Sequence, residues 1–191
     1  QLTNPVGPAI NIQSQKRAFV HLAANTENKL VDGNQYITST TEDSKGTVFS
    51  EGILLINGKG KLTINSNYGH ALVSDQYLRL QDGTLIVENT KKDGIHANDA
   101  VIIDGGSLTI AAAGDDGIEC EKGPIIINNG TITINSTGKA ITASYDTDTT
   151  YDPYLTINGG KIVINTEDEG IESKSVLTIN AGDIQINAKD D

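Results

Sequence analysis

The chain has 191 residues, with 25 Asp and Glu against 14 Lys and Arg, and its formal charge is −11. No Lys/Arg-rich stripe interrupts this acidity, which argues against nucleic acid as a direct partner. No apolar run approaches the ~20 residues that would insert across a membrane. A single Cys excludes an internal disulfide framework and a Cys-based zinc finger, and 20 Gly with 4% aromatic residues favour many short strands and turns.

The first 52 residues are irregular. Short apolar segments at 10–12, 19–22, 30–33 and 48–49 alternate with polar turns and predict strands, enough for about two irregular coils. The polar segment 37–45 is expected to be an exposed loop. Because no linker or low-complexity tract separates residues 1–52 from the rest, we expect a single domain over 1–191.

From about residue 53 the sequence repeats with a period near 23. Each repeat reads apolar-x-apolar, two turn residues, Gly, x-apolar-x-apolar, and five repeats add a third short apolar segment. The repeat glycines are Gly60, Gly83, Gly106, Gly130, Gly160 and Gly182. Their spacings are 23, 23, 24, 30 and 22, so the value of 30 marks one insertion, SYDTDTTYDPY.

Three alternating strands in so short a repeat cannot bury their apolar faces alone, but stacked repeats can. The pattern therefore predicts an all-β fold, a three-sided, right-handed parallel β-helix of about eight coils, regular over 53–191. Cys120 falls in an inward column of small residues, which indicates packing and not nucleophilic chemistry. Repeated Asn at the turns, such as Asn128 and Asn158, are interpreted as structural amide ladders.

Carboxylates gather where successive coils align. Residues at equivalent positions lie ~4.8 Å apart in a β-helix, so Asp93, Asp115, Asp116 and Glu119 should converge on one patch. Such close carboxylates repel one another unless a cation lies among them, and an oxygen-only ligand set favours Ca²⁺. The alternative is a solvated acidic face that binds nothing in particular.

A second acidic cluster lies near the end of the chain. Asp168, Glu169 and Glu172 share one coil, and Asp190 and Asp191 fall in the columns of Asp168 and Glu169. These five residues are a second candidate metal site. The insertion, with Asp146, Asp148 and Asp152, is a third candidate metal site. A solvated loop that binds no metal is an equally weighted alternative for it.

Three basic residues stand among these acids. Lys139 lies in the column between Asp116 and Glu169, where it is expected to form salt bridges with both, although a Lys beside a calcium site could also abstract a proton. His70 and His96 are a weak metal signal because no third nitrogen ligand accompanies them. Both are expected at the surface, His96 as a candidate ligand contact.

The D-G-I elements at 93–95 and 116–118, together with E-N-K-L-V-D-G-N-Q-Y at 27–36, resemble secreted bacterial carbohydrate-binding β-helix domains. That family is similar to the family 9 polysaccharide lyases, which are calcium-dependent pectate lyases. The resemblance implies Ca²⁺, a secreted, extracellular location at the cell surface, and affinity for pectin, polygalacturonic acid and cellulose. It places the calcium ligands at Asp93, Asp115, Asp116 and Glu119, where Glu replaces the lyases' last Asp, and makes Lys139 the candidate base.

Two main hypotheses follow. The first is non-catalytic, calcium-dependent binding of acidic plant cell-wall polysaccharide, with cellulose as a second partner. Its candidate contacts are Lys139, His96 and the stacking residues Tyr145, Tyr151 and Tyr154, with Tyr68 and Tyr77 as further aromatic groups. The rival is a calcium-assisted lyase with Lys139 as base, and a surface repeat without a ligand is the third class.

Overall fold

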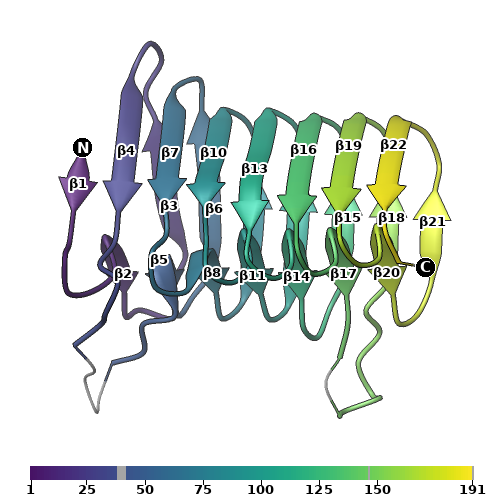
Figure 1. The fold of residues 1–191 in the computed structure, drawn as a ribbon, viewed down its shortest axis with the longest axis horizontal. Coiled ribbons are helices and arrows are strands. Elements are labelled where there is room, and N and C mark those ends of the chain that lie inside the picture. Colours follow the sequence, from purple (N-terminus) through teal and green to yellow (C-terminus); the bar gives the residue numbers. More distant parts are fainter. Residues whose placement is uncertain (38–41, 146, 191) are drawn as a thin grey trace.

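The computed structural model describes residues 1–37, 42–145 and 147–190. These residues form 22 β-strands and no helix, and the strands wind into three parallel sheets that run the length of the molecule (Figure 1). Within the described ranges, no helix has the length and apolar character needed to cross a membrane.

Each of the first seven coils contributes one strand to each sheet, and β22 adds an eighth strand to sheet A. Sheet A contains β1 (Leu2–Thr3), β4 (Glu27–Val31), β7 (Lys61–Asn65), β10 (Thr84–Asn89), β13 (Ser107–Ala113), β16 (Thr131–Ser136), β19 (Lys161–Thr166) and β22 (Asp183–Ala188). Sheet B contains β2 (Ile10–Ile12), β5 (Gly46–Ser50), β8 (His70–Ser74), β11 (Ile95–Ala97), β14 (Ile118–Cys120), β17 (Ile141–Ala143) and β20 (Ile171–Ser173). Sheet C contains β3 (Ala18–Leu22), β6 (Leu54–Gly58), β9 (Tyr77–Leu80), β12 (Ala100–Ile103), β15 (Ile125–Ile127), β18 (Leu155–Ile157) and β21 (Leu177–Ile179).

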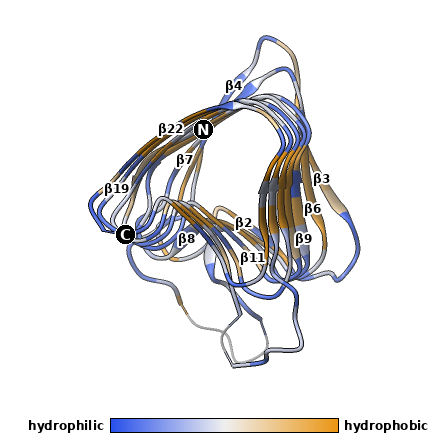
Figure 2. Cartoon of the chain, turned by 90° about the vertical axis from the view of Figure 1, so that its right-hand side faces the viewer, coloured by the Kyte–Doolittle hydropathy of each residue, from blue (hydrophilic) through white to orange (hydrophobic). Residues whose placement is uncertain are grey.

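The strands pair in the register that the 23-residue period predicts. Ile64 of sheet A lies opposite Val87, and Leu54 of sheet C lies opposite Leu78. These residues are fully buried in an apolar core that continues from coil to coil, and Figure 2 shows the apolar interior along the solenoid axis. The predicted three-sided parallel β-helix is therefore confirmed, with eight strands in its longest sheet.

The turn between sheets C and A requires glycine. Gly83, Gly106, Gly130, Gly160 and Gly182 have positive φ values, and in the second coil Gly58 and not Gly60 has this conformation. A Cβ on Gly106 would lie 2.6 Å from the carbonyl oxygen of Gly83. The stacked backbones thus leave no room for a side chain at this turn.

The irregular first 52 residues also form coils. Strands β2, β3, β4 and β5 lie at or near the four predicted apolar segments, although β4 begins earlier, at Glu27. Part of the predicted loop, residues 38–41, lies outside the described residues.

Cys120 and the turn asparagines have the structural roles expected of them. Cys120 is fully buried and lies in register between Ala97 and Ala143. Burial raises the pKa of its thiol to about 11, so the reactive thiolate is disfavoured. Asn158 donates to the Asn128 side chain at 2.9 Å, which extends an amide ladder along the turn.

Candidate functional site

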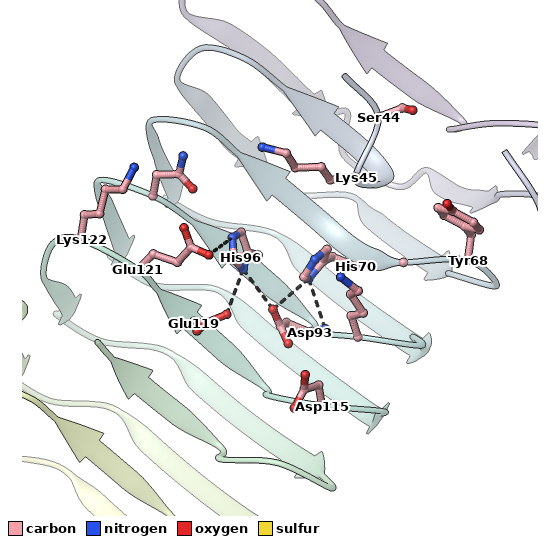
Figure 3. A pocket seen from close by; sticks show the side chains of 13 residues that line it. Ser44, Lys45, Tyr68, His70, Asp93, His96, Asp115, Glu119, Glu121 and Lys122 are labelled. Atoms are coloured by element: carbon pink, nitrogen blue, oxygen red, sulfur yellow. Dashed lines mark hydrogen bonds and ion pairs between the residues drawn. The ribbon is translucent and has the colours of Figure 1, made fainter. Parts of the chain in front are cut away.

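A groove of about 940 Å³ crosses the outer face of sheet B at β8, β11 and β14 (Figure 3). Its walls carry Tyr68 toward one end and Lys122 toward the other, and the central residues His70, Asp93 and His96 lie between them. The groove therefore spans several coils of the solenoid. It collects side chains that are about 23 residues apart in the sequence.

The D-G-I element explains how the central side chains are positioned. Ile95 points into the core and is fully buried. A Cβ on Gly94 would lie 2.6 Å from Ile110 Cδ1 and 2.7 Å from the carbonyl oxygen of Gly117, so only glycine fits this close approach. The buried Ile and the tight Gly hold Asp93 and His96 on either side of them, where both side chains are buried at the base of the groove.

Backbone amides link the central column from coil to coil. The amide of Asp93 lies 3.4 Å from His70 Nδ1, the amide of Asp116 donates to Asp93 Oδ1 at 3.1 Å, and the amide of Lys139 donates to Asp116 Oδ1 at 2.7 Å. Each side chain is thus oriented by the coil that follows it. This ladder accounts for one oxygen of Asp93 and one of Asp116.

Asp93 is the centre of the cluster and is only 2% exposed. Its Oδ2 lies 2.8 Å from His70 Nδ1 and 3.0 Å from His96 Nδ1. Burial alone would raise the pKa of Asp93, but the hydrogen bonds with the two imidazoles outweigh burial and hold it well below its usual range.

The expectation that both histidines lie at the surface is wrong. His70 and His96 are 8% and 7% exposed, and their rings pack against each other with centroids 4.6 Å apart. His96 Nδ1 also lies 3.0 Å from Glu119 Oε2. Burial lowers the pKa of His96, but its hydrogen bonds to Asp93 and Glu119 prevail and raise it to about 9.

The four predicted central carboxylates lie near one another. Asp93, Asp116 and Glu119 each offer an oxygen, and these oxygens lie within 4.8 Å of one another. Burial and the negative charges of Asp93 and Glu119 raise the pKa of Asp116 to about 7. Asp115 lies outside this closest group but lines the groove together with Asp93 and Glu119, whereas Asp116 lies beside the groove and is not one of its lining residues.

The absence of a side chain at Gly138 leaves space for both adjacent aspartates. A Cβ there would lie 2.8 Å from Asp115 Oδ1 and closer still to Asp116 Oδ1. The oxygens therefore gather around a space that only glycine leaves open. Carboxylate oxygens gathered around such a space fit a hard cation, and the irregular, oxygen-rich set suits Ca²⁺.

The C-terminal acidic cluster is arranged differently. Glu172 Oε2 lies 2.7 Å from Lys139 Nζ and accepts a hydrogen bond from Thr142 at 3.0 Å, and Glu172 also pairs with Lys174. Burial would raise the pKa of Glu172, but these partners hold it at about 2. In the same cluster, Glu169 Oε2 is buried and has no hydrogen-bond partner among the described residues.

Among the described residues, no group of three ligand atoms within 4.8 Å includes a member of the C-terminal cluster. The four described members of that cluster are Asp168, Glu169, Glu172 and Asp190. The fifth predicted residue, Asp191, lies outside the described residues. The second metal site stays a prediction.

Lys139 pairs with the later coil only. Its ammonium lies 2.7 Å from Glu172 and 3.8 Å from Glu169, whereas only its backbone amide contacts Asp116. The expected salt bridge to Asp116 is therefore wrong, because the side chain extends away from that coil. Burial would lower the pKa of Lys139, but the hydrogen bond to Glu172 outweighs it and raises the pKa above its ordinary value.

Of the candidate stacking residues, Tyr151 is the most open. It is 41% exposed and lines a second hollow of about 330 Å³, which shares Glu121 and Lys122 with the main groove. Tyr145 and Tyr154 are half-buried.

The groove also contains Tyr68, one of the further aromatic groups considered for stacking, and lysines for which the sequence predicted no role. Tyr68 is 44% exposed and stacks on Tyr36 with centroids 4.1 Å apart. Lys45 pairs with Asp43 and Asp75, whereas Lys92 and Lys122 have no ion pair or hydrogen bond through their ammonium groups within the described chain. Lys92 directly precedes the first D-G-I element, which is the signal that could have identified it.

The fold and the site together define a parallel β-helix protein with an elongated polar groove across its coils. The family model for carbohydrate-binding domain-containing proteins matches residues 1–191, and the chain belongs to this family.

A carbohydrate-binding domain-containing protein of Acetivibrio thermocellus is 27% identical over 89 residues, which are 46% of this chain and 31% of that protein. The match thus spans about a third of the length of that relative. Among solved structures, the gadolinium derivative of the polysaccharide lyase-like protein from C. thermocellum is similar, with a TM-score of 0.81 and 27% identity. That similarity covers 95% of this chain and 73% of the other.

Proposed function

We propose that the chain binds acidic plant cell-wall polysaccharide of the pectin and polygalacturonate type, without turnover, through Ca²⁺ held in the central groove. We place this function outside the cell, at the cell surface. The observation that carries the proposal is the groove itself, where converging carboxylates lie beside two lysines that have no ion pair among the described residues.

The charge of the groove makes an acidic ligand feasible. Three lysines and four carboxylates line it, a formal balance of −1 against −11 for the whole chain. One Ca²⁺ changes this local balance to +1. A metal ion bridging protein and uronate carboxylates would then attract a polymer that the rest of the surface repels.

The ligand chemistry supports Ca²⁺. The central set contributes carboxylate oxygens from Asp93, Asp115, Asp116 and Glu119, and hard cations prefer such ligands. The raised pKa of Asp116 reflects negative charge that a bound cation would offset. The similar polysaccharide lyase-like structure is a gadolinium derivative, and Gd³⁺ is likewise a hard cation.

Aromatic side chains flank the groove. Tyr68 stands at one end, and Tyr151 stands beside the hollow that shares Lys122 with the other end. Exposed tyrosine rings can stack on the apolar faces of sugar rings, and this supports polymer binding along the solenoid, including binding of cellulose.

The lyase alternative depends on Lys139. A general base must be deprotonated and within reach of the substrate proton. The ion pair with Glu172 favours the protonated form of Lys139, which cannot accept a proton. This observation favours binding over elimination.

The test uses chelator-stripped protein. We expect calorimetry to detect Ca²⁺ binding, and retention on polygalacturonate to require Ca²⁺ and disappear with chelator. Retention on cellulose is measured in parallel. Unchanged retention in chelator would contradict calcium dependence, and unsaturated product that accumulates with the wild type but not with Lys139→Ala would establish the lyase instead.

A further inference from the structure

A nitrogen-containing ligand set lies on the opposite side of Asp93 from Asp116. We propose that His70, Asp93 and His96 bind a divalent transition metal of the zinc class, with Glu119 as the fourth ligand. This site differs in ligand chemistry from the oxygen-only calcium site. It does not depend on the polysaccharide function proposed above.

The three side chains converge on one point. His70 Nδ1 and His96 Nδ1 lie 2.8 and 3.0 Å from the same atom, Asp93 Oδ2, and the ligand atoms of all three residues lie within 4.8 Å of one another. All three residues are at least nine-tenths buried. Glu119 Oε2 approaches His96 Nδ1 to 3.0 Å from the next coil, and Figure 3 shows these side chains pointing toward one another.

The contacts that His70 and His96 make with Asp93 are the ones that a metal would replace. Both Nδ1 atoms lie within hydrogen-bond distance of Asp93 Oδ2, so a shared proton holds each imidazole against the carboxylate. A zinc ion requires neutral imidazole and ionised carboxylate, and it would displace these protons on binding. The hydrogen bonds thus already gather the ligand atoms that zinc needs.

The second nitrogen of His96 has a partner of its own. His96 Nε2 lies 3.5 Å from Glu121 Oε1, close to hydrogen-bond reach. A carboxylate behind the imidazole of a metal-ligating histidine fixes its tautomer and orients the other nitrogen toward the metal. The ring of His96 is therefore oriented to bind through Nδ1.

Zinc fits this ligand set better than calcium does. Imidazole suits Zn²⁺ and its neighbours in the first transition row, and two His with carboxylates make a familiar four-coordinate zinc site. Calcium takes oxygen ligands only in its usual sites. Asp93 thus belongs to both the zinc and the calcium ligand sets. Its Oδ2 faces the two histidines, and its Oδ1 accepts a hydrogen bond from the Asp116 amide.

The two proposals can be separated experimentally because only zinc binding requires His70. Metal-stripped protein is titrated with Zn²⁺ alone by calorimetry at neutral pH. We expect one Zn²⁺ per chain, and at least about 100-fold weaker binding in His70→Ala and His96→Ala, since even outer-shell changes cost ~10–100-fold. The matched control is His21→Ala, because His21 is exposed, lies in β3 of sheet C, and its imidazole hydrogen-bonds to the Asn57 side chain of β6.

X-ray absorption at the zinc edge on the wild type should detect imidazole scattering at ~2.0 Å, and this measurement needs no variant. Absence of Zn²⁺ binding, zinc without imidazole scattering, or full affinity in a folded His70→Ala would each overturn the proposal. His70→Ala should retain Ca²⁺ binding. Loss of calcium and polysaccharide binding with intact zinc binding would refute the proposed function alone, and the reverse result would refute the zinc site alone.

Discussion

The central and C-terminal clusters carry the same acidic spacing two coils apart, yet their carboxylates have different partners. Asp115, Asp116 and Glu119 of the central cluster correspond to Asp168, Glu169 and Glu172. In the central cluster Glu119 faces a histidine, and in the C-terminal cluster Glu172 is held by two lysines.

The difference arises from the preceding coil. On the preceding coil, Asp93 occupies the position that corresponds to Asp116. Lys139 likewise occupies the position that corresponds to Glu169 on the coil before it. Burial and the charges of Asp93 and Glu119 raise the pKa of Asp116 to about 7, whereas burial of Glu172 is outweighed by Lys139, Lys174 and Thr142, which hold its pKa at about 2. Equivalent sequence spacing therefore identifies which carboxylates are neighbours, while the adjacent coil decides whether they need an external cation.

The largest effect is expected for calcium affinity. Asp116→Asn should weaken Ca²⁺ binding at least about 100-fold, since affinity depends on the number of charged oxygen ligands. The control is Glu172→Gln, which removes a carboxylate already neutralised by lysine and should leave the affinity unchanged. Calorimetry measures both; equal losses in the two variants would mean that the clusters are not functionally different.

The next effect concerns stability without metal. Because the folded state raises the pKa of Asp116 to about 7, the wild type in chelator should lose stability as the pH rises from near 4 to near 7. Asp116→Asn abolishes this loss and should be more stable at neutral pH by about 1 kcal/mol, or ~2–4 °C in Tm. Added Ca²⁺ should reverse the order of the two proteins.

Thermal melts across this pH range, with and without Ca²⁺, make the measurement. A less stable Asp116→Asn in chelator would show that the carboxylate stabilises the metal-free protein, contrary to the repulsion inferred here.

A smaller effect tests which cluster faces the polysaccharide. Lys122→Ala removes from the central groove an ammonium that has no ion pair within the described part of the chain. It should weaken retention on polygalacturonate about threefold, as expected for an exposed ion pair. Lys189→Ala changes the net charge equally, but Lys189 pairs with Glu167 beside the C-terminal cluster. Comparable losses in both variants would indicate a long-range charge effect and not a groove contact.

The sequence predicted the fold closely because the period fixes the register. Ile64 and Leu54 lie in the predicted ladders, since every coil presents its apolar residues at the same positions. The aligned columns also predicted correctly that Asp93, Asp116 and Glu119 lie close together.

Side-chain direction was not predictable in the same way. The column assigned Lys139 equally to Asp116 and Glu169, but its long side chain extends toward the later coil. His70 and His96 were missed as buried residues because their burial depends on ring packing across coils, which no single repeat encodes.

The smallest expected effect is on the stability that the C-terminal acidic cluster contributes. Glu172→Gln should cost about 0.5 kcal/mol, because the Lys139 and Glu172 side chains are 24% and 18% exposed and such partly solvated pairs contribute little. The folded state lowers the pKa of Glu172 to about 2 from an ordinary value of 4.5. Its contribution is therefore present above pH ~4.5 and is lost as the pH falls toward ~2.

The difference in Tm between wild type and Glu172→Gln should accordingly be largest near neutral pH and vanish in strong acid. Glu88→Gln is the matched control, because the Lys29–Glu88 pair is about 40% exposed on both sides and should contribute almost nothing. A Tm difference for Glu172→Gln that persists in strong acid would mean that packing, and not the lysine charges, stabilises this cluster. The contrast with the central carboxylates would then not be electrostatic.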